Sequence, residues 1–221
     1  MGINRYNQRN PFELEGRADM NSYLKGHQFQ NKIREKLESI TSKYRWCKTL
    51  SEPRIQGKSN ILKLDLVVAA EKVITGGHLY LAMIECKGPG RNPSPPVYWS
   101  LMSKAYTKLN DLRLQRAKGC HSFYLLVNRR PVKGESPRLD YPQLFKCIGV
   151  ELVHEDDPKE LAVFEEQMDR LCRENSPVRQ LKEMSLDEKA KFPPEVWKKA
   201  RERALKEIDR LKLLGLEELA S

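Results

Sequence analysis

The sequence predicts an α/β fold, a mixed central β-sheet flanked by helices and followed by a C-terminal helical appendage. One observation is the order of hydrophobic patterns, in which a helical stripe precedes three strand-like segments, followed by helix, strand, strand and helix. The other is that strand-like patterns stop and charge becomes dense after Pro177. A three-strand meander followed by a helical crossover predicts a mixed sheet with helices on both faces.

The chain begins with a polar segment and an amphipathic helix. Residues 1–21 are polar and aperiodic, so we expect an N-terminal arm there. From Ser22 to about Ser42 apolar side chains recur every three to five residues, which predicts a helix with one buried face. Residues 44–50 then alternate like a short strand, and residues 51–60 are predicted to be loop because Pro, Gly, Ser and Asn are frequent.

Two further strands and a glycine turn form the next unit. Residues 61–70 alternate between two faces, and Asp65 interrupts one of them with a carboxylate. The pair of glycines at 76–77 predicts a turn, so the second and third strands should form a hairpin. Residues 79–87 are apolar on both faces until Glu85, which is typical of a central strand covered on both sides.

The remaining elements of the main domain alternate between helix and strand. We predict a long helix over 97–117, a strand over 121–128, a strand over 147–155 and a helix over 158–175. The resulting order is α-β-β-β-α-β-β-α, with residues 22–175 as one domain. Residues 176–221 are predicted to be a helical extension, which includes a charged amphipathic helix over 195–214.

Charge is distributed unevenly along the chain. The 221 residues carry 40 Lys and Arg against 30 Asp and Glu, a formal net charge of +10. Residues 1–150 hold 26 of the basic and 12 of the acidic side chains, whereas residues 151–175 hold 3 and 9. This segregation favours a polyanionic partner such as nucleic acid. No basic amphipathic helix with a strong apolar face supports an acidic membrane surface instead.

The composition also narrows the compartment and the chemistry. No segment is apolar enough to span a bilayer or to serve as a signal peptide, so a soluble, intracellular, cytoplasmic protein is expected. The five cysteines are an odd, scattered set without a C-x-x-C pair, and the four histidines are dispersed. These patterns disfavour a disulfide framework, a zinc site and a recognisable Cys/His nucleophile.

Three charged residues near two strand ends form the candidate site. If the two strands pair about the glycine turn, Asp65, Glu85 and Lys87 can face the same side of the sheet. Two close carboxylates suit Mg²⁺, which takes one or two carboxylates together with waters and phosphate oxygens. The adjacent lysine would orient or deprotonate an attacking water and balance the charge of the transition state. A structural ion pair at a solvated strand end is the alternative interpretation.

This arrangement resembles the PD-(D/E)-x-K nuclease superfamily, the restriction-endonuclease-like proteins, whose core has the same α-β-β-β-α-β order. The resemblance implies Asp65 and Glu85 as metal ligands, the backbone carbonyl of Cys86 as a further ligand, and Lys87 as the catalytic lysine. Leu64 replaces the proline of the motif.

Many members of the superfamily also carry a metal-binding glutamate on the first helix, and the corresponding residue here is Gln30. Gln30 could bind metal through its amide oxygen, Glu35 could substitute for it, or the site could rely on Asp65 and Glu85 alone.

DNA contacts are expected from basic residues near the same rim. Arg129, Arg130 and Lys133 follow the fourth strand and would emerge beside Lys87 if that strand runs parallel to the third. A solvated turn explains any one of them equally well. A second set of candidates consists of Arg91, Asn92, Lys104 and Lys108.

The sequence therefore predicts an Mg²⁺-dependent endonuclease, with Mn²⁺ able to substitute, that cuts double-stranded DNA and leaves 5′-phosphates. A homodimer is expected, because cutting both strands needs two sites. The small size of the chain and the absence of a helicase or ATPase motif fit a stand-alone enzyme of restriction or defence type. A junction resolvase or DNA repair nuclease would use the same residues. A non-catalytic nucleic-acid-binding or assembly module, and a basic scaffold whose C-terminal helices bind a protein, are the alternatives of other classes.

Overall fold

The structure is a computed structural model that describes residues 11–56, 61–87, 95–113, 122–127, 140–213 and 215, with the side chains of 11–23, 95–97, 112–113 and 122 left out. Its centre is a five-stranded sheet with the strand order β1-β4-β5-β6-β7. The strands are β1 (Cys47–Ser51), β4 (Leu66–Glu71), β5 (His78–Lys87), β6 (Ser122–Val127) and β7 (Glu151–His154). β1, β4 and β5 are antiparallel neighbours, whereas β5, β6 and β7 run parallel. The predicted mixed sheet is confirmed.

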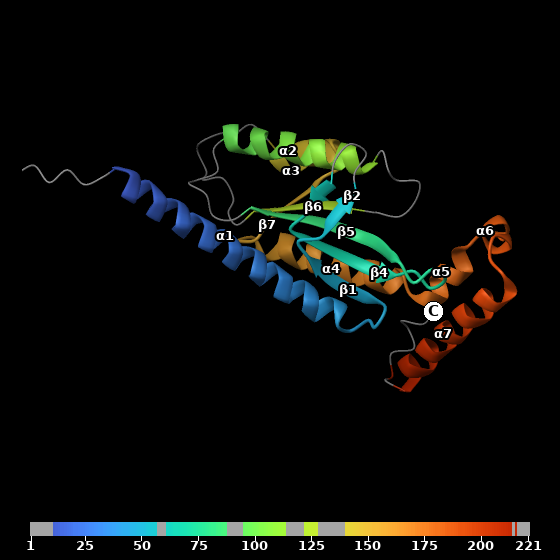
Figure 1. The fold of residues 1–221 in the computed structure, drawn as a ribbon. Helices are drawn as coiled ribbons and strands as arrows, with labels where there is room; N and C mark the ends of the chain where they lie inside the picture. The colour runs from blue at the N-terminus through green and yellow to red at the C-terminus, as the bar shows by residue number, and fades with distance from the viewer. Residues whose placement is uncertain are drawn as a thin grey trace, which may run out of the picture.

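Helices cover both faces of this sheet (Figure 1). One face packs against α1 (Pro11–Thr41) and α4 (Pro158–Glu174), and the other against α2 (Pro95–Arg113) and α3 (Tyr141–Cys147). α1 contributes Phe29, Ile33 and Leu37 to the first core, at the spacing of a single helical stripe. β4 and β5 are buried on both faces, as their uninterrupted apolar sequences predict.

The first helix begins earlier than its sequence pattern indicates. α1 starts at Pro11, so residues 11–21 belong to this helix and not to an aperiodic arm. Figure 1 shows that the N-terminal part of α1 extends past the edge of the sheet. An apolar stripe forms only where a helix meets a core, so a helical segment beyond the sheet carries no periodic signal.

The predicted strand over 61–70 is two strands. β3 (Ile61–Lys63) pairs with β2 (Arg54–Gln56) in a separate two-stranded sheet, and β4 joins the main sheet. Between them, the amide of Glu52 donates to the carbonyl of Asp65 at 2.8 Å, so this backbone pairs with the preceding segment. The prediction that residues 51–60 are loop is wrong for β2.

The predicted strand over 147–155 is shorter, because a helix occupies the preceding residues. Asp140 accepts a hydrogen bond from the amide of Gln143 and caps α3, whose Phe145 is fully buried in the core. The chain then turns through Gly149, which has a positive φ of 78°, and β7 begins only at Glu151.

The predicted C-terminal helical extension contains three described helices. They are α5 (Pro177–Glu183), α6 (Leu186–Ala190) and α7 (Pro194–Leu213), and α6 begins with a capping box of Ser185 and Glu188. Gln180 attaches α5 to the turn after β4, since its side chain bonds the carbonyl of Glu71 and the amide of Val73. In the described part of the chain, no helix is long and apolar enough to cross a membrane.

Candidate active site

The structure brings Asp65 and Glu85 together. β4 and β5 pair with Leu66 opposite Ile84, so the next step along both strands places Asp65 opposite Glu85. Val67 and Met83 lie two residues from Asp65 and Glu85 along the chain and belong to the core beneath α2. Because side chains alternate between the faces of a sheet, both carboxylates point toward that same face. A hairpin with a turn at Gly76, as predicted, therefore produces this juxtaposition.

The carboxylate of Asp65 is held against the end of β5. Its Oδ2 accepts a hydrogen bond from the backbone amide of Cys86 at 2.7 Å. The ammonium nitrogen of Lys87 lies 3.9 Å from the same oxygen. About a quarter of the Asp65 side chain is exposed, so this carboxylate is oriented by the sheet while it stays open to solvent.

Glu85 is the buried carboxylate of the site, with only 4% of its side chain exposed. Lys87 donates to Oε2 at 3.2 Å and Lys108 donates to Oε1 at 2.5 Å. The ammonium of Lys108 also donates to the backbone carbonyl of Lys63 at 3.2 Å. A buried carboxylate requires such partners, because burying a charge without them is costly.

Lys87 lies between the two carboxylates and is 40% exposed. Its ammonium is a cation in contact with Glu85 and near Asp65, which shows that the geometry accommodates positive charge between them. The oxygen-rich pair therefore fits Mg²⁺, which needs only one or two carboxylates and completes its shell with water and phosphate. Asp65, Glu85 and the carbonyl of Cys86 are the groups that would hold the ion.

The thiol of Cys86 does not take part in this site. Cys86 belongs to the core on the opposite face of the sheet, beneath α1 and α4. Burial raises the pKa of this thiol above its usual value, and the carboxylates of Asp65 and Glu85 raise that pKa further. The thiol is therefore protonated at neutral pH and is neither a nucleophile nor a metal ligand.

The structure distinguishes between the two candidates on the first helix. The side-chain amide of Gln30 donates to the backbone carbonyl of Asp65 at 3.3 Å, so Gln30 lies at the site. Glu35 is exposed and lies roughly 140° around the helix from Gln30. A helix of this geometry cannot direct both side chains to the same place, so Gln30, and not Glu35, is the α1 residue that lies beside Asp65.

Oxygen donors at this site are few. Within the described residues, no group of three or more His, Cys, Asp or Glu side chains is arranged to hold a metal ion. Any ion here would rely on two carboxylates and neutral oxygens, which is the donor set of Mg²⁺ and not that of zinc.

A hollow of about 330 Å³ opens between β5 and α2 beside the carboxylates. Glu85 and Lys87 line one side of it, and Lys104 and Lys108 line the other. Lys104 is exposed, whereas Lys108 is partly buried and its ammonium donates to Glu85. The sequence predicted Lys108 as a DNA contact but did not reveal its bond to Glu85.

Five predicted DNA contacts lie outside the described residues. They are Arg91, Asn92, Arg129, Arg130 and Lys133. β6 runs parallel to β5, as the prediction required, and its last residue Val127 pairs with Lys87.

His154, at the end of β7, forms a buried polar cluster that sequence reasoning did not assign. Its Nε2 lies 3.1 Å from the hydroxyl of Tyr98, and its Nδ1 lies 2.8 Å from the carboxylate of Glu160. The carboxylate of Glu160 also accepts from the His154 amide. The cluster connects α2, β7 and α4, so it is a structural group and satisfies the histidine.

Comparisons with known proteins add little to this description. No protein-family model and no curated protein matches the chain. A solved structure, "Crystal Structure of Protein of Unknown Function AF1548", aligns over 78% of this chain and 94% of its own, with 14% identity and a TM-score of 0.39.

Proposed function

We propose that this protein is an Mg²⁺-dependent endonuclease that hydrolyses phosphodiester bonds in double-stranded DNA. The observation that carries the proposal is the position of the Lys87 ammonium at the end of a central strand. It contacts the carboxylate of Glu85 and lies 3.9 Å from that of Asp65. The two carboxylates would bind a metal ion, and the ammonium beside them would stabilise negative charge on a phosphate. The basic character of residues 1–150 supports a polyanionic substrate.

Each residue has a distinct role in the proposed reaction. Asp65 and Glu85 would hold the ion, which when bound supplies positive charge at the phosphate and makes water more acidic. Gln30 fixes the backbone of Asp65, and the Cys86 amide fixes its carboxylate. Lys87 would orient the attacking water and stabilise the charge that develops on the phosphate oxygens. Attack in line with the P–O3′ bond leaves a 3′-hydroxyl and a 5′-phosphate.

Two features concern the substrate and the assembly. Lys104 is exposed at the rim of the hollow beside Glu85, where it could bind a backbone phosphate. Cleavage of both strands requires two such sites, so we infer that the protein acts as a homodimer. A restriction or defence role is part of this proposal.

A non-catalytic nucleic-acid-binding module is the second candidate, and a specific contact favours it. Glu85 already has both oxygens bonded to lysines, so its charge is compensated without a metal ion. In that case the charged cluster would stabilise the end of β5, and the protein would bind DNA without cutting it.

Cleavage of supercoiled plasmid distinguishes the two candidates. We expect the wild type to cut with Mg²⁺ or Mn²⁺, to stop in EDTA and to leave ends that ligase can rejoin. Asp65→Asn retains an oxygen for the Cys86 amide but loses the charge, so cleavage should fall about 100-fold or more. Glu52→Gln is the matched control, because Glu52 is a nearby exposed carboxylate that pairs with Lys63. Metal-dependent cutting by Asp65→Asn at the wild-type rate would exclude this site.

A panel of substrates separates the nuclease roles. Linear duplex, nicked duplex and four-way junction of the same sequence would be compared at equal concentration. Preference for plain duplex supports the restriction or defence role, whereas preference for the junction or the nick assigns a resolvase or repair role. DNA binding without cleavage of any of them would favour the non-catalytic module.

A further inference from the structure

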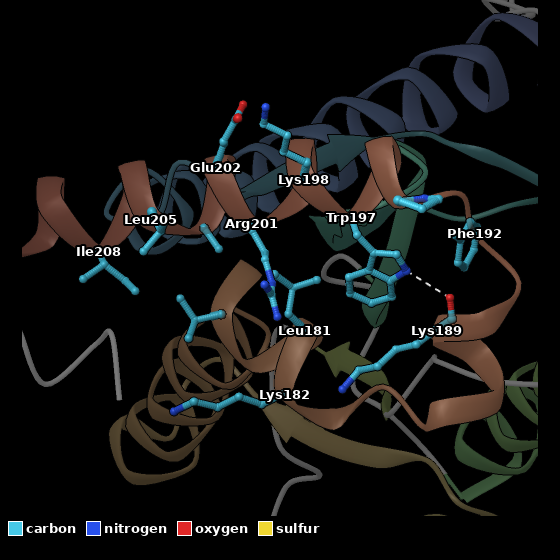
Figure 2. A pocket seen from close by; sticks show the side chains of 13 residues that line it. Leu181, Lys182, Lys189, Phe192, Trp197, Lys198, Arg201, Glu202, Leu205 and Ile208 are labelled. Atoms are coloured by element: carbon cyan, nitrogen blue, oxygen red, sulfur yellow. Dashed lines mark hydrogen bonds between the residues drawn. The ribbon is translucent and has the colours of Figure 1, made fainter.

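The C-terminal helices enclose an apolar groove that the proposed nuclease site does not use. The groove has a volume of about 950 Å³ and lies between α7 on one side and α5 and α6 on the other (Figure 2). Its floor consists of side chains that are at most partly buried. They are Val178, Leu181, Phe192, Trp197, Leu205 and Ile208.

This groove lies far from the carboxylates. α5 is attached to the turn between β4 and β5, whereas Asp65 and Glu85 lie at the opposite end of that hairpin. A ligand in the groove would leave the proposed DNA site accessible.

The apolar floor is well organised. The indole of Trp197 points from α7 toward α6, where its Nε1 donates to the backbone carbonyl of Lys189 at 2.9 Å (Figure 2). Leu205 lies two turns further along α7 and is 58% exposed. Trp197 and Ile208 are separated by roughly 16 Å along the helix axis, or about three turns of a helix laid beside α7. A groove with an apolar floor and charged residues at its border suits an amphipathic partner.

Charge at the groove identifies the kind of partner. Arg201 and Lys189 project into the space between α7 and the shorter helices, whereas Glu202 and Lys198 project from the other side of α7 (Figure 2). A partner that fits would bring apolar side chains to the floor and carboxylates to Arg201 and Lys189. A second copy of this chain does not fit through the same face, because a two-fold contact would bring two cationic sets together.

We propose that the α5–α7 groove is a docking site for an acidic amphipathic helix of a partner protein. Leucine-type side chains of that helix would cover Trp197, Leu205 and Ile208, and its glutamates or aspartates would pair with Arg201 and Lys189. Helix-in-groove recognition uses apolar anchors at successive turns, and the groove length matches about three turns. The proposal is independent of the nuclease assignment.

A synthetic peptide tests the proposal with the full-length chain. The probe is a fluorescein-labelled helix of about 14 residues with leucines on one face and glutamates on the other. We expect saturable binding by fluorescence anisotropy. Leu205→Asp should weaken it about tenfold or more, because it places a charge in the apolar contact. Arg201→Glu should weaken it about threefold or more, and a lysine version of the peptide should recover affinity for this variant.

Two matched controls lie on the same helix. Leu213→Asp changes an 87% exposed leucine that does not line the groove, and Lys199→Glu reverses an exposed charge outside it. Both should bind the acidic peptide within about twofold of the wild type.

Other occupants give different results. Failure of the acidic peptide to bind, or equal binding by Leu205→Asp, would overturn the proposal. So would self-association of the wild type that Leu205→Asp abolishes in sedimentation, since the groove would then hold a second copy. Leu205-dependent binding to phosphatidylserine vesicles, or displacement of the peptide by duplex DNA, would assign the groove to a lipid surface or to nucleic acid.

Discussion

Lys108 should compete with a divalent cation for Glu85, and its replacement by methionine measures that competition. Lys108 donates to Oε1 of Glu85 at 2.5 Å, and Glu85 is almost completely buried. Methionine retains most of the apolar stem but removes the ammonium. One oxygen of a buried carboxylate would then have lost its cationic partner, while Lys87 still holds the other at 3.2 Å.

The expected cost follows from this geometry. Loss of a charge-assisted hydrogen bond to a buried group costs about 1–3 kcal/mol. Because Lys87 remains bonded, we expect the lower part of this range, about 1–2 kcal/mol in EDTA. For a domain of this size that loss lowers Tm by about 2–8 °C. Saturating Mg²⁺ should recover stability, since a ligand at ten times its Kd contributes about 1.4 kcal/mol.

Thermal unfolding with EDTA and with Mg²⁺ provides the assay. The stabilisation by Mg²⁺ should be larger for Lys108→Met than for the wild type, because the variant has no ammonium to displace from Glu85. Lys104→Met is the control, since Lys104 lies one turn earlier on α2 and is exposed. The reasoning is refuted if Lys108→Met unfolds like the wild type in EDTA, or if Mg²⁺ stabilises both equally.

Three further predictions concern separate parts of the molecule. Gln30→Glu removes the donor to the Asp65 carbonyl and adds a carboxylate, so titration calorimetry should show tighter Mg²⁺ binding. The lost hydrogen bond should lower the stability in EDTA by about 1 kcal/mol. Unchanged Mg²⁺ affinity would argue against Gln30 at the site. The exposed Cys147 should be alkylated at about pH 8 well before Cys86, because burial and a raised pKa keep the Cys86 thiol protonated. Peptide mass mapping would measure both rates, and equal rates would contradict the burial of Cys86. Tyr98→Phe should cost about 1 kcal/mol in urea unfolding by removing the hydroxyl that pairs with His154, and no loss would mean that the contact is not formed.

The arrangement of the proposed site could be predicted from the sequence for a local reason. Asp65 and Glu85 lie on strands joined by a short turn, so alternation and a single hairpin register suffice to place them on one face. Lys87 follows from the same alternation, two residues after Glu85. Parallel pairing of β6 with β5 also followed from a connection long enough to hold a helix.

Other features depend on contacts that no local pattern encodes. The bond between Lys108 and Glu85 requires the placement of α2 over β5, across 23 residues of sequence. The break at Asp65 arises because the preceding segment supplies a hydrogen-bond partner, Glu52, that an apolar run does not reveal. α3 was missed because a helix of seven residues is too short to show a clear helical periodicity.

The central claim is that Lys87 acts with two carboxylates in cutting DNA, and plasmid cleavage by Lys87→Met tests it most directly. With Mg²⁺ present, we expect the wild type to convert supercoiled plasmid to nicked and linear forms. Lys87→Met should cleave the plasmid more slowly by a factor of about 100 or more, while it binds DNA nearly as well as the wild type. Cleavage by Lys87→Met at the wild-type rate, or no metal-dependent cleavage by the wild type, would contradict the account.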